Sequence, residues 1–125
     1  MQNFLLVMLG GGLGAGARHL VNMTLPRFAG SALPWHTIAV NIVGSFAMGV
    51  LVGWLARRSG DANSMKLFLA TGLLGGFTTF SAFSLDFALL WQRGDGPAAF
   101  AYAAISVVGA LIAIFAGLWL VRAVG

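Results

Sequence analysis

The sequence predicts an all-α membrane protein built from four transmembrane helices. Hydrophobic residues make up 59% of the 125 residues, whereas Asp, Glu, Lys and Arg together make up only 8%. A soluble domain ordinarily carries about 25% charged residues, so this chain lacks the side chains needed to cover a water-exposed surface. Apolar runs of about 20 residues, the length that crosses a bilayer as a helix, recur along the chain and are separated by short turn-forming breaks.

The predicted spans form a single domain over residues 1–125. The last break, at 93–97, places Pro97 in the first turn of a helix, where its missing N–H does no harm. All four tryptophans fall at span ends, as in the aromatic belt of a membrane protein. The first span is expected to remain uncleaved, because Met1-Gln2-Asn3 lacks the basic residues of a signal peptide. The spans are expected at residues 4–22, 35–55, 67–91 and 98–121.

Composition also excludes several classes of function. The chain has no cysteine, so disulfide scaffolds and thiol nucleophiles are absent. The basic residues are scattered rather than gathered on one face, which argues against a nucleic-acid partner. The two histidines, His19 and His36, lie near span ends without a metal or acid–base cluster beside them. The chain is therefore not expected to be an enzyme.

The basic residues give almost no signal for orientation in the membrane. Of the seven, four fall on the side that holds both termini (Arg57, Arg58, Lys66 and Arg122) and three on the other (Arg18, Arg27 and Arg93). The positive-inside rule therefore leaves two interpretations open. Either the termini are cytoplasmic by an excess of one charge, or the chain has dual topology and assembles as an antiparallel homodimer with a two-fold axis in the membrane plane.

The middle of the third span is a poor continuous helix. Gly75-Gly76 is followed closely by Thr78-Thr79, and paired glycines cost about 1 kcal/mol each relative to alanine. Non-helical backbone at membrane depth survives only inside protein or along a polar cavity. The pattern favours a broken third helix with freed backbone groups, and the alternative is a kinked helix whose glycines make packing contacts.

Polar and aromatic side chains share this depth. Asn41 lies inside the second span, and an amide in hydrocarbon must face the protein interior to find partners. Phenylalanines recur at three- and four-residue spacing from Phe77 to Phe87, interleaved with Thr78, Thr79 and Ser81. Such a stripe is most often packing or lipid contact, but ring edges are electropositive. Edges beside hydroxyl and amide donors predict a dry path for a small anion.

Three motifs in order along the chain resemble those of one family. The first span contains GAGAR at 14–18, the second VNIVGSF at 40–46, and the third GLLGGFTTFSAF at 72–83. Together they resemble the CrcB/Fluc family of fluoride ion channels over the whole length of the chain. The resemblance implies a multi-pass protein of the plasma (inner) membrane that exports fluoride passively and protects the cell from its toxicity. It also implies an antiparallel dual-topology homodimer with a structural sodium ion at its centre.

The same resemblance assigns roles to individual residues. The backbone carbonyls of Gly75 and Thr78 match the positions that hold sodium between the two copies. Two departures from the family pattern stand in the fourth span, where Ala110 and Ile114 occupy steps that often carry hydroxyls. The residues expected to line the fluoride pore are Asn41, Phe80, Phe83, Ser81, Thr79, Arg18, Tyr102 and Ser106.

Asp86 supports an alternative function. It is the only carboxylate within a predicted span, and a deep carboxylate is what a proton-coupled exporter needs. Small dual-topology multidrug exporters resemble this chain in architecture, although their key carboxylate is a glutamate in the first helix and this chain contains none. The other interpretation is that Asp86 is a hydrogen-bonded structural residue near the membrane interface. Fluoride efflux that ignores a pH gradient separates the channel from the exporter.

Overall fold

The computed structural model describes residues 1–24, 33–57 and 63–125, and these ranges are helical apart from short connections. Four apolar stretches are long enough to cross a membrane: α1 (Gln2–Thr24), α2 (Trp35–Ala56), a stretch over Lys66–Gln92, and α6 (Gly96–Val124). This confirms the prediction of four long apolar helices. Residues 25–32 and 58–62, which belong to the predicted breaks on either side of the second span and include Arg27 and Arg58, lie outside the described residues.

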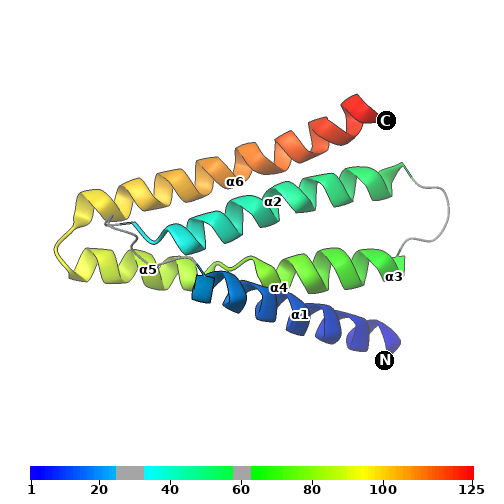
Figure 1. Ribbon diagram of the computed structural model, residues 1–125, viewed down its shortest axis with the longest axis horizontal. Helices are drawn as coiled ribbons and strands as arrows, with labels where there is room; N and C mark the ends of the chain where they lie inside the picture. The colour runs from blue at the N-terminus through cyan, green and yellow to red at the C-terminus, as the bar shows by residue number, and fades with distance from the viewer. Residues whose placement is uncertain (25–32, 58–62) are drawn as a thin grey trace.

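The third stretch consists of several shorter elements. α3 (Asn63–Met65) leads into a π-helix, η1 (Lys66–Leu74), which is followed by α4 (Gly75–Phe77) and then by α5 (Ser81–Gln92). Thr78, just after α4, has extended backbone angles, with φ −82° and ψ 156°. Figure 1 shows α4 and α5 joined by a thin non-helical segment in the middle of the molecule. The π-helix was not predicted from the sequence.

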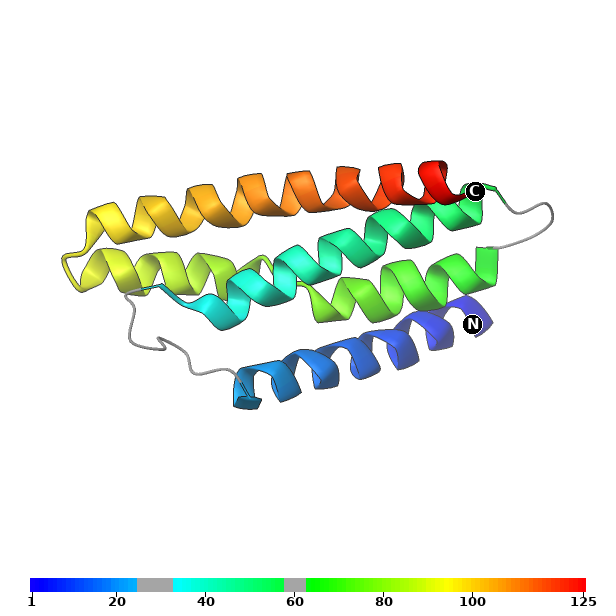
Figure 2. The same cartoon turned by 45° about the horizontal axis from the view of Figure 1, so that its top comes forward.

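The long helices lie side by side along one direction. α2 packs along α6, α1 packs on η1 and α4, and α5 packs on α6. Figures 1 and 2 show both chain ends at the same end of the bundle, as an even number of spans requires. At the opposite end, the turn between α5 and α6 uses Gly94 in a left-handed conformation (φ 81°), and the Asp95 side chain accepts a hydrogen bond from the Ala98 amide at 3.3 Å.

Close helix packing depends on glycine where α1 crosses the third stretch. A Cβ atom at Gly14 would collide with the backbone carbonyl of Leu73, and one at Gly10 would lie 2.9 Å from the Leu73 amide nitrogen. Small residues at four-residue spacing let two backbones approach this closely in a membrane. The spacing therefore positions α1 against η1 and α4.

Few side chains are fully buried in the single chain. A small core forms where α2, α5 and α6 meet, around Ile38, Leu90, Ala99 and Tyr102. Many large apolar side chains on the outer faces are exposed instead, Phe4 on α1 and Phe115 on α6 among them. A surface of this kind is suited to lipid or to a second protein copy rather than to water.

Candidate functional site

The Asn41 side chain joins α2 to the non-helical segment after α4. Its Nδ2 donates a hydrogen bond to the Thr79 carbonyl at 3.1 Å, and its Oδ1 accepts one from the Thr79 amide at 2.9 Å. Both backbone groups of Thr79 are thus satisfied by a side chain instead of by a helix. Asn41 finds inside the protein the partners that an amide at membrane depth needs.

This arrangement removes the usual donors from two backbone carbonyls. In a continuous helix the Gly75 carbonyl would accept from the Thr79 amide, but that amide donates to Asn41. The Thr78 carbonyl would accept from the Ala82 amide, but that amide donates to the Thr79 hydroxyl at 3.1 Å. These are the two carbonyls that we expected, from the family resemblance, to hold a sodium ion. Carbonyls released from helical hydrogen bonds have lone pairs available for a cation.

A groove of about 470 Å³ opens beside this segment. It is formed by residues of α2, the Gly75–Phe80 region, α5 and α6, and it is mostly apolar with a few polar groups. Seven of the residues expected at the functional site line this one groove: Asn41, Gly75, Thr78, Thr79, Phe80, Phe83 and Ser106.

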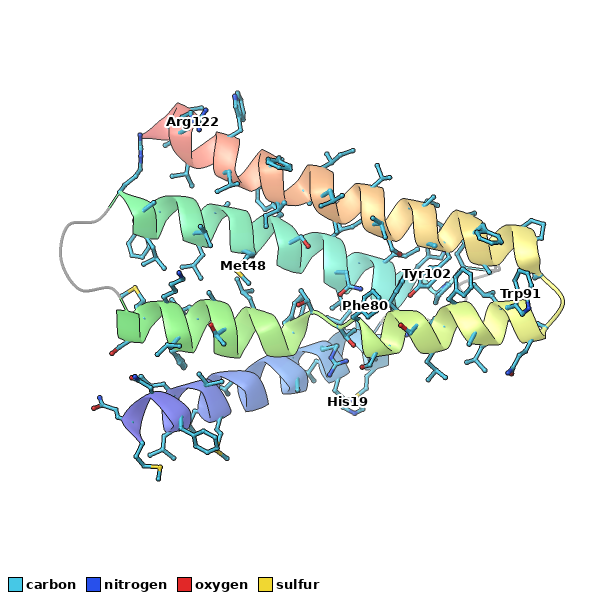
Figure 3. The ribbon with its side chains drawn as sticks, turned by 180° about the vertical axis from the view of Figure 1, so that it is seen from behind. His19, Met48, Phe80, Trp91, Tyr102 and Arg122 are labelled. Carbon is cyan, nitrogen blue, oxygen red and sulfur yellow. The ribbon has the colours of Figure 1, made fainter. Side chains whose placement is uncertain are left out.

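Two phenylalanines form the aromatic wall of the groove. The rings of Phe80 and Phe83 lie 5.5 Å apart between centroids and are tilted by 38°. Phe80 is 76% exposed in the single chain, so its ring projects from the surface instead of filling a core. Figure 3 shows it at the junction of the two helical parts of the third stretch, with Tyr102 nearby. The ring edges supply weakly positive surface without a formal charge.

α6 contributes one polar and one apolar position to the same groove. Ser106 is 4% exposed, and its Oγ has no hydrogen-bond partner among the described residues. A buried hydroxyl without a partner is costly, so it favours a ligand that accepts a hydrogen bond. Ala110, one turn further along, lines the groove with a methyl group. Ile114 is instead a packing residue, with its backbone against Gly49 of α2.

Tyr102 was expected in the pore, and the structure places it behind the groove wall. It is 0% exposed, its ring lies 5.1 Å from that of Phe83, and its hydroxyl donates to Asp86 Oδ2 at 3.3 Å. The Thr37 hydroxyl donates to the same oxygen at 2.7 Å. Asp86 is 3% exposed, so this carboxylate is enclosed by hydrogen-bond donors within the bundle.

Two further expected pore residues also lie away from the groove. Arg18 lines a separate pocket of about 200 Å³ together with Thr37, Thr79 and Asp86. Ser81 is exposed, and its hydroxyl lies 3.2 Å from that of Thr79. Thr79 is therefore common to the groove and to the smaller pocket.

Sequence reasoning missed some residues of these cavities. Thr37 was not singled out, although it lies four residues before Asn41 and so on the same face of α2. The four-residue spacing from Asn41 could therefore have identified Thr37 from the sequence. Val107 and Leu111 line the groove on α6, but nothing distinguishes them from the lipid-facing residues of an apolar helix.

Fold and groove together define a class of protein: a small multi-pass membrane protein that moves a small solute along a mostly apolar path with few polar donors. The CrcB-like (Camphor Resistance) family model matches residues 5–118, and the chain belongs to this family. It is 62% identical to the "Fluoride-specific ion channel FluC" of Mesorhizobium japonicum over 98% of each chain. Proteins of the same name from Chelativorans sp. (56% identity, 99% of each chain) and Sphingopyxis alaskensis (51%, 98% of this chain and 97% of the relative) are also similar.

Proposed function

We propose that this chain is a fluoride-specific ion channel of the plasma membrane, a transporter rather than an enzyme, and that it lets fluoride leave the cell down its electrochemical gradient. Family membership and the names of relatives with 51–62% identity support the choice of ion. The observation that carries the mechanism is the groove, in which Asn41 and Ser106 supply donors beside the Phe80 and Phe83 rings.

Fluoride needs replacements for its water molecules when it enters such a path. The Asn41 amide uses one N–H to hold Thr79, and its second N–H is the group that we assign to the ion. The Ser106 hydroxyl, which has no partner among the described residues, is the next donor along the groove. The phenylalanine edges add weak positive surface, which lets the ion enter without binding too tightly to leave.

The pathway is completed by a second copy of the chain in the opposite orientation. The groove is open along one side of the single chain, and both Phe80 and Gly75 are exposed there. The near balance of basic residues is compatible with insertion both ways. An antiparallel dual-topology homodimer would cover this face, and the broken third helix would lie at its centre.

A structural sodium ion fits the same interface. The Gly75 and Thr78 carbonyls have lost their helical donors to Asn41 and Thr79, and carbonyl oxygen is a suitable ligand for a hard cation. These two residues would hold the ion together with their counterparts in the second copy. The ion would neutralise partial negative charge buried by the dimer, and it is a structural component rather than the permeant species.

The proton-coupled exporter is not favoured. Such a mechanism needs a carboxylate that alternates between a proton and the substrate. Asp86 accepts hydrogen bonds from both Thr37 and Tyr102 and is almost completely buried behind the groove wall. It therefore stabilises the contact between α2, α5 and α6.

Anion efflux from liposomes tests the proposal. Purified protein in vesicles loaded with fluoride should release it rapidly once a potassium ionophore removes the voltage, and chloride should remain inside. A pH gradient should leave the fluoride rate unchanged at a fixed internal pH. Equal release of chloride would contradict fluoride selectivity, and a strict requirement for a proton gradient would replace the channel with the exporter.

A further inference from the structure

A buried histidine belongs to the hydrogen-bond network behind the groove. His36, in the first turn of α2, is 6% exposed, and its Nε2 lies 3.3 Å from the Thr37 hydroxyl. Thr37 donates to Asp86, which also accepts from Tyr102. Three helices therefore contribute to one network, α2 through His36 and Thr37, α5 through Asp86, and α6 through Tyr102.

The direction of these hydrogen bonds assigns the proton on the imidazole. Because the Thr37 hydroxyl gives its only hydrogen to Asp86, the contact with His36 requires an N–H at Nε2. Nε2 carries a hydrogen in this neutral tautomer and also in the charged imidazolium. Protonation of His36 therefore adds a charge without breaking the contact with Thr37.

His36 lines the pocket that Arg18 and Asp86 share. Among the described residues that line the pocket, the other ionisable side chains are Arg18 on α1 and Asp86 on α5. Tyr102 of α6 also contacts Asp86 through its hydroxyl. Protonation of His36 would add one positive charge to the described residues that line this pocket. Thr79 lines both this pocket and the groove, so the added charge would lie next to the proposed ion path.

We propose that His36 is a positioning residue that makes fluoride conduction sensitive to pH: it holds Thr37 on Asp86 in both protonation states, and its protonation draws fluoride toward the groove. This inference rests on the proposed fluoride function. Histidine is the side chain whose ordinary titration falls between pH 5 and 8. A cavity with low-dielectric walls focuses the field of an added charge and raises the local concentration of a counter-ion. Flux should therefore increase as the solution becomes more acidic.

Fluoride efflux from proteoliposomes, measured at equal pH on both sides, tests the inference. Protein-free vesicles give the background at each pH, since protonated fluoride crosses lipid unaided. Between about pH 8 and about pH 5.5 the parent flux should rise roughly three- to tenfold. His36→Gln keeps an N–H donor for Thr37 but cannot titrate, so it should match the parent near pH 8 and lose the rise. His19→Gln, which removes the exposed histidine of α1, should retain it.

Several results would overturn the inference. A parent flux that does not change with pH contradicts the inference but leaves the proposed function standing. The same holds if the flux of His36→Gln rises with acidity as the parent flux does. An absence of fluoride flux at every pH contradicts the proposed function together with the inference. His19→Gln leaves His36 as the sole histidine, so its imidazole NMR signals in micelles report this residue even if His36→Gln does not assemble. Failure of these signals to shift between about pH 8 and about pH 5.5 also overturns the inference.

Discussion

Side chains along the groove offer an anion two different kinds of contact. Asn41, Ser106, Phe80 and Phe83 all line the groove, and in the proposed channel the first two offer hydrogen-bond donors and the phenylalanines offer ring edges. Donors alone would hold a small anion tightly, and rings alone would not replace its water. In the proposed channel, the two kinds of contact together would keep the ion neither too stable nor too unstable at any point, which conduction requires.

Phe83→Ile should reduce fluoride efflux about fivefold, because a contact worth about 1 kcal/mol is lost at a point where the ion has few other partners. Phe80→Ile should act in the same direction. Both substitutions keep the position apolar. Initial efflux rates from liposomes, at matched amounts of assembled protein, provide the measurement.

Phe100→Ile is the matched control for these variants. Phe100 is an exposed aromatic residue of α6 that contacts Phe87 and Trp91 in edge-to-face geometry, away from the groove. The Phe100→Ile variant should conduct fluoride at the parent rate. If Phe80→Ile and Phe83→Ile also conduct at the parent rate, these two phenylalanines have a packing role only.

Residue chemistry explains how much of the site could be predicted from sequence. Asn41 and the phenylalanines were accessible because an amide at membrane depth and an aromatic stripe are unusual in an apolar helix. Helical periodicity places a residue on a face but does not say which neighbouring helix covers that face. For this reason it could not place Tyr102 behind the groove wall, or Arg18 in a separate pocket.

At the scale of helices and segments, α2 lies close to Thr78 at Gly44. A Cβ atom at Gly44 would collide with the Thr78 side chain and would lie 3.2 Å from a Phe77 ring carbon. Gly44→Ala should displace the segment that carries the Thr78 carbonyl, at a cost of about 1–3 kcal/mol. We expect slower fluoride efflux and a lower midpoint of thermal unfolding in detergent.

Gly12→Ala provides the comparison for Gly44→Ala. A Cβ atom at Gly12 would meet nothing within 4 Å, so this change adds the same methyl group to a helix without crowding any neighbour. It should behave like the parent or be slightly more stable. Equal effects of the two substitutions would mean that the tight contact at Gly44 has no influence on Thr78.

Removal of sodium tests the role of the interrupted third stretch. If the Gly75 and Thr78 carbonyls need a cation, long dialysis into a large organic cation should reduce fluoride efflux or increase dimer dissociation. Buried carbonyls that lack both a donor and a cation are expensive. Readdition of sodium should reverse the change. Unchanged efflux and unchanged dissociation would mean that this segment serves packing alone.

The elements themselves were predictable to different degrees. Four long apolar helices follow from hydropathy, because the chain must satisfy its backbone hydrogen bonds inside the membrane. The π-helix over Lys66–Leu74 was missed, since its wider turns leave no periodic signature in a run of mostly apolar residues. The hydrogen bonds of Asn41 to Thr79 were also inaccessible, because they join residues distant in sequence.

For the whole molecule, the proposed antiparallel dimer can form a complete pathway only if copies insert in both orientations. Two lysines added after Met1 should bias every copy to one orientation, because basic residues divide almost evenly between the two sides. Activity should then fall to background. Co-expression with a copy biased the opposite way should restore it. Full activity of the singly biased protein would contradict dual topology.

Electrical recording across a planar bilayer tests most directly whether the assembled protein is a passive fluoride channel. With a tenfold fluoride gradient, the current should reverse at about 59 mV, with the sign set by fluoride alone. A superimposed pH gradient should leave this reversal potential where it is, even if it changes the size of the current. A reversal potential that follows the proton gradient, or fluoride movement without any current, would contradict the account.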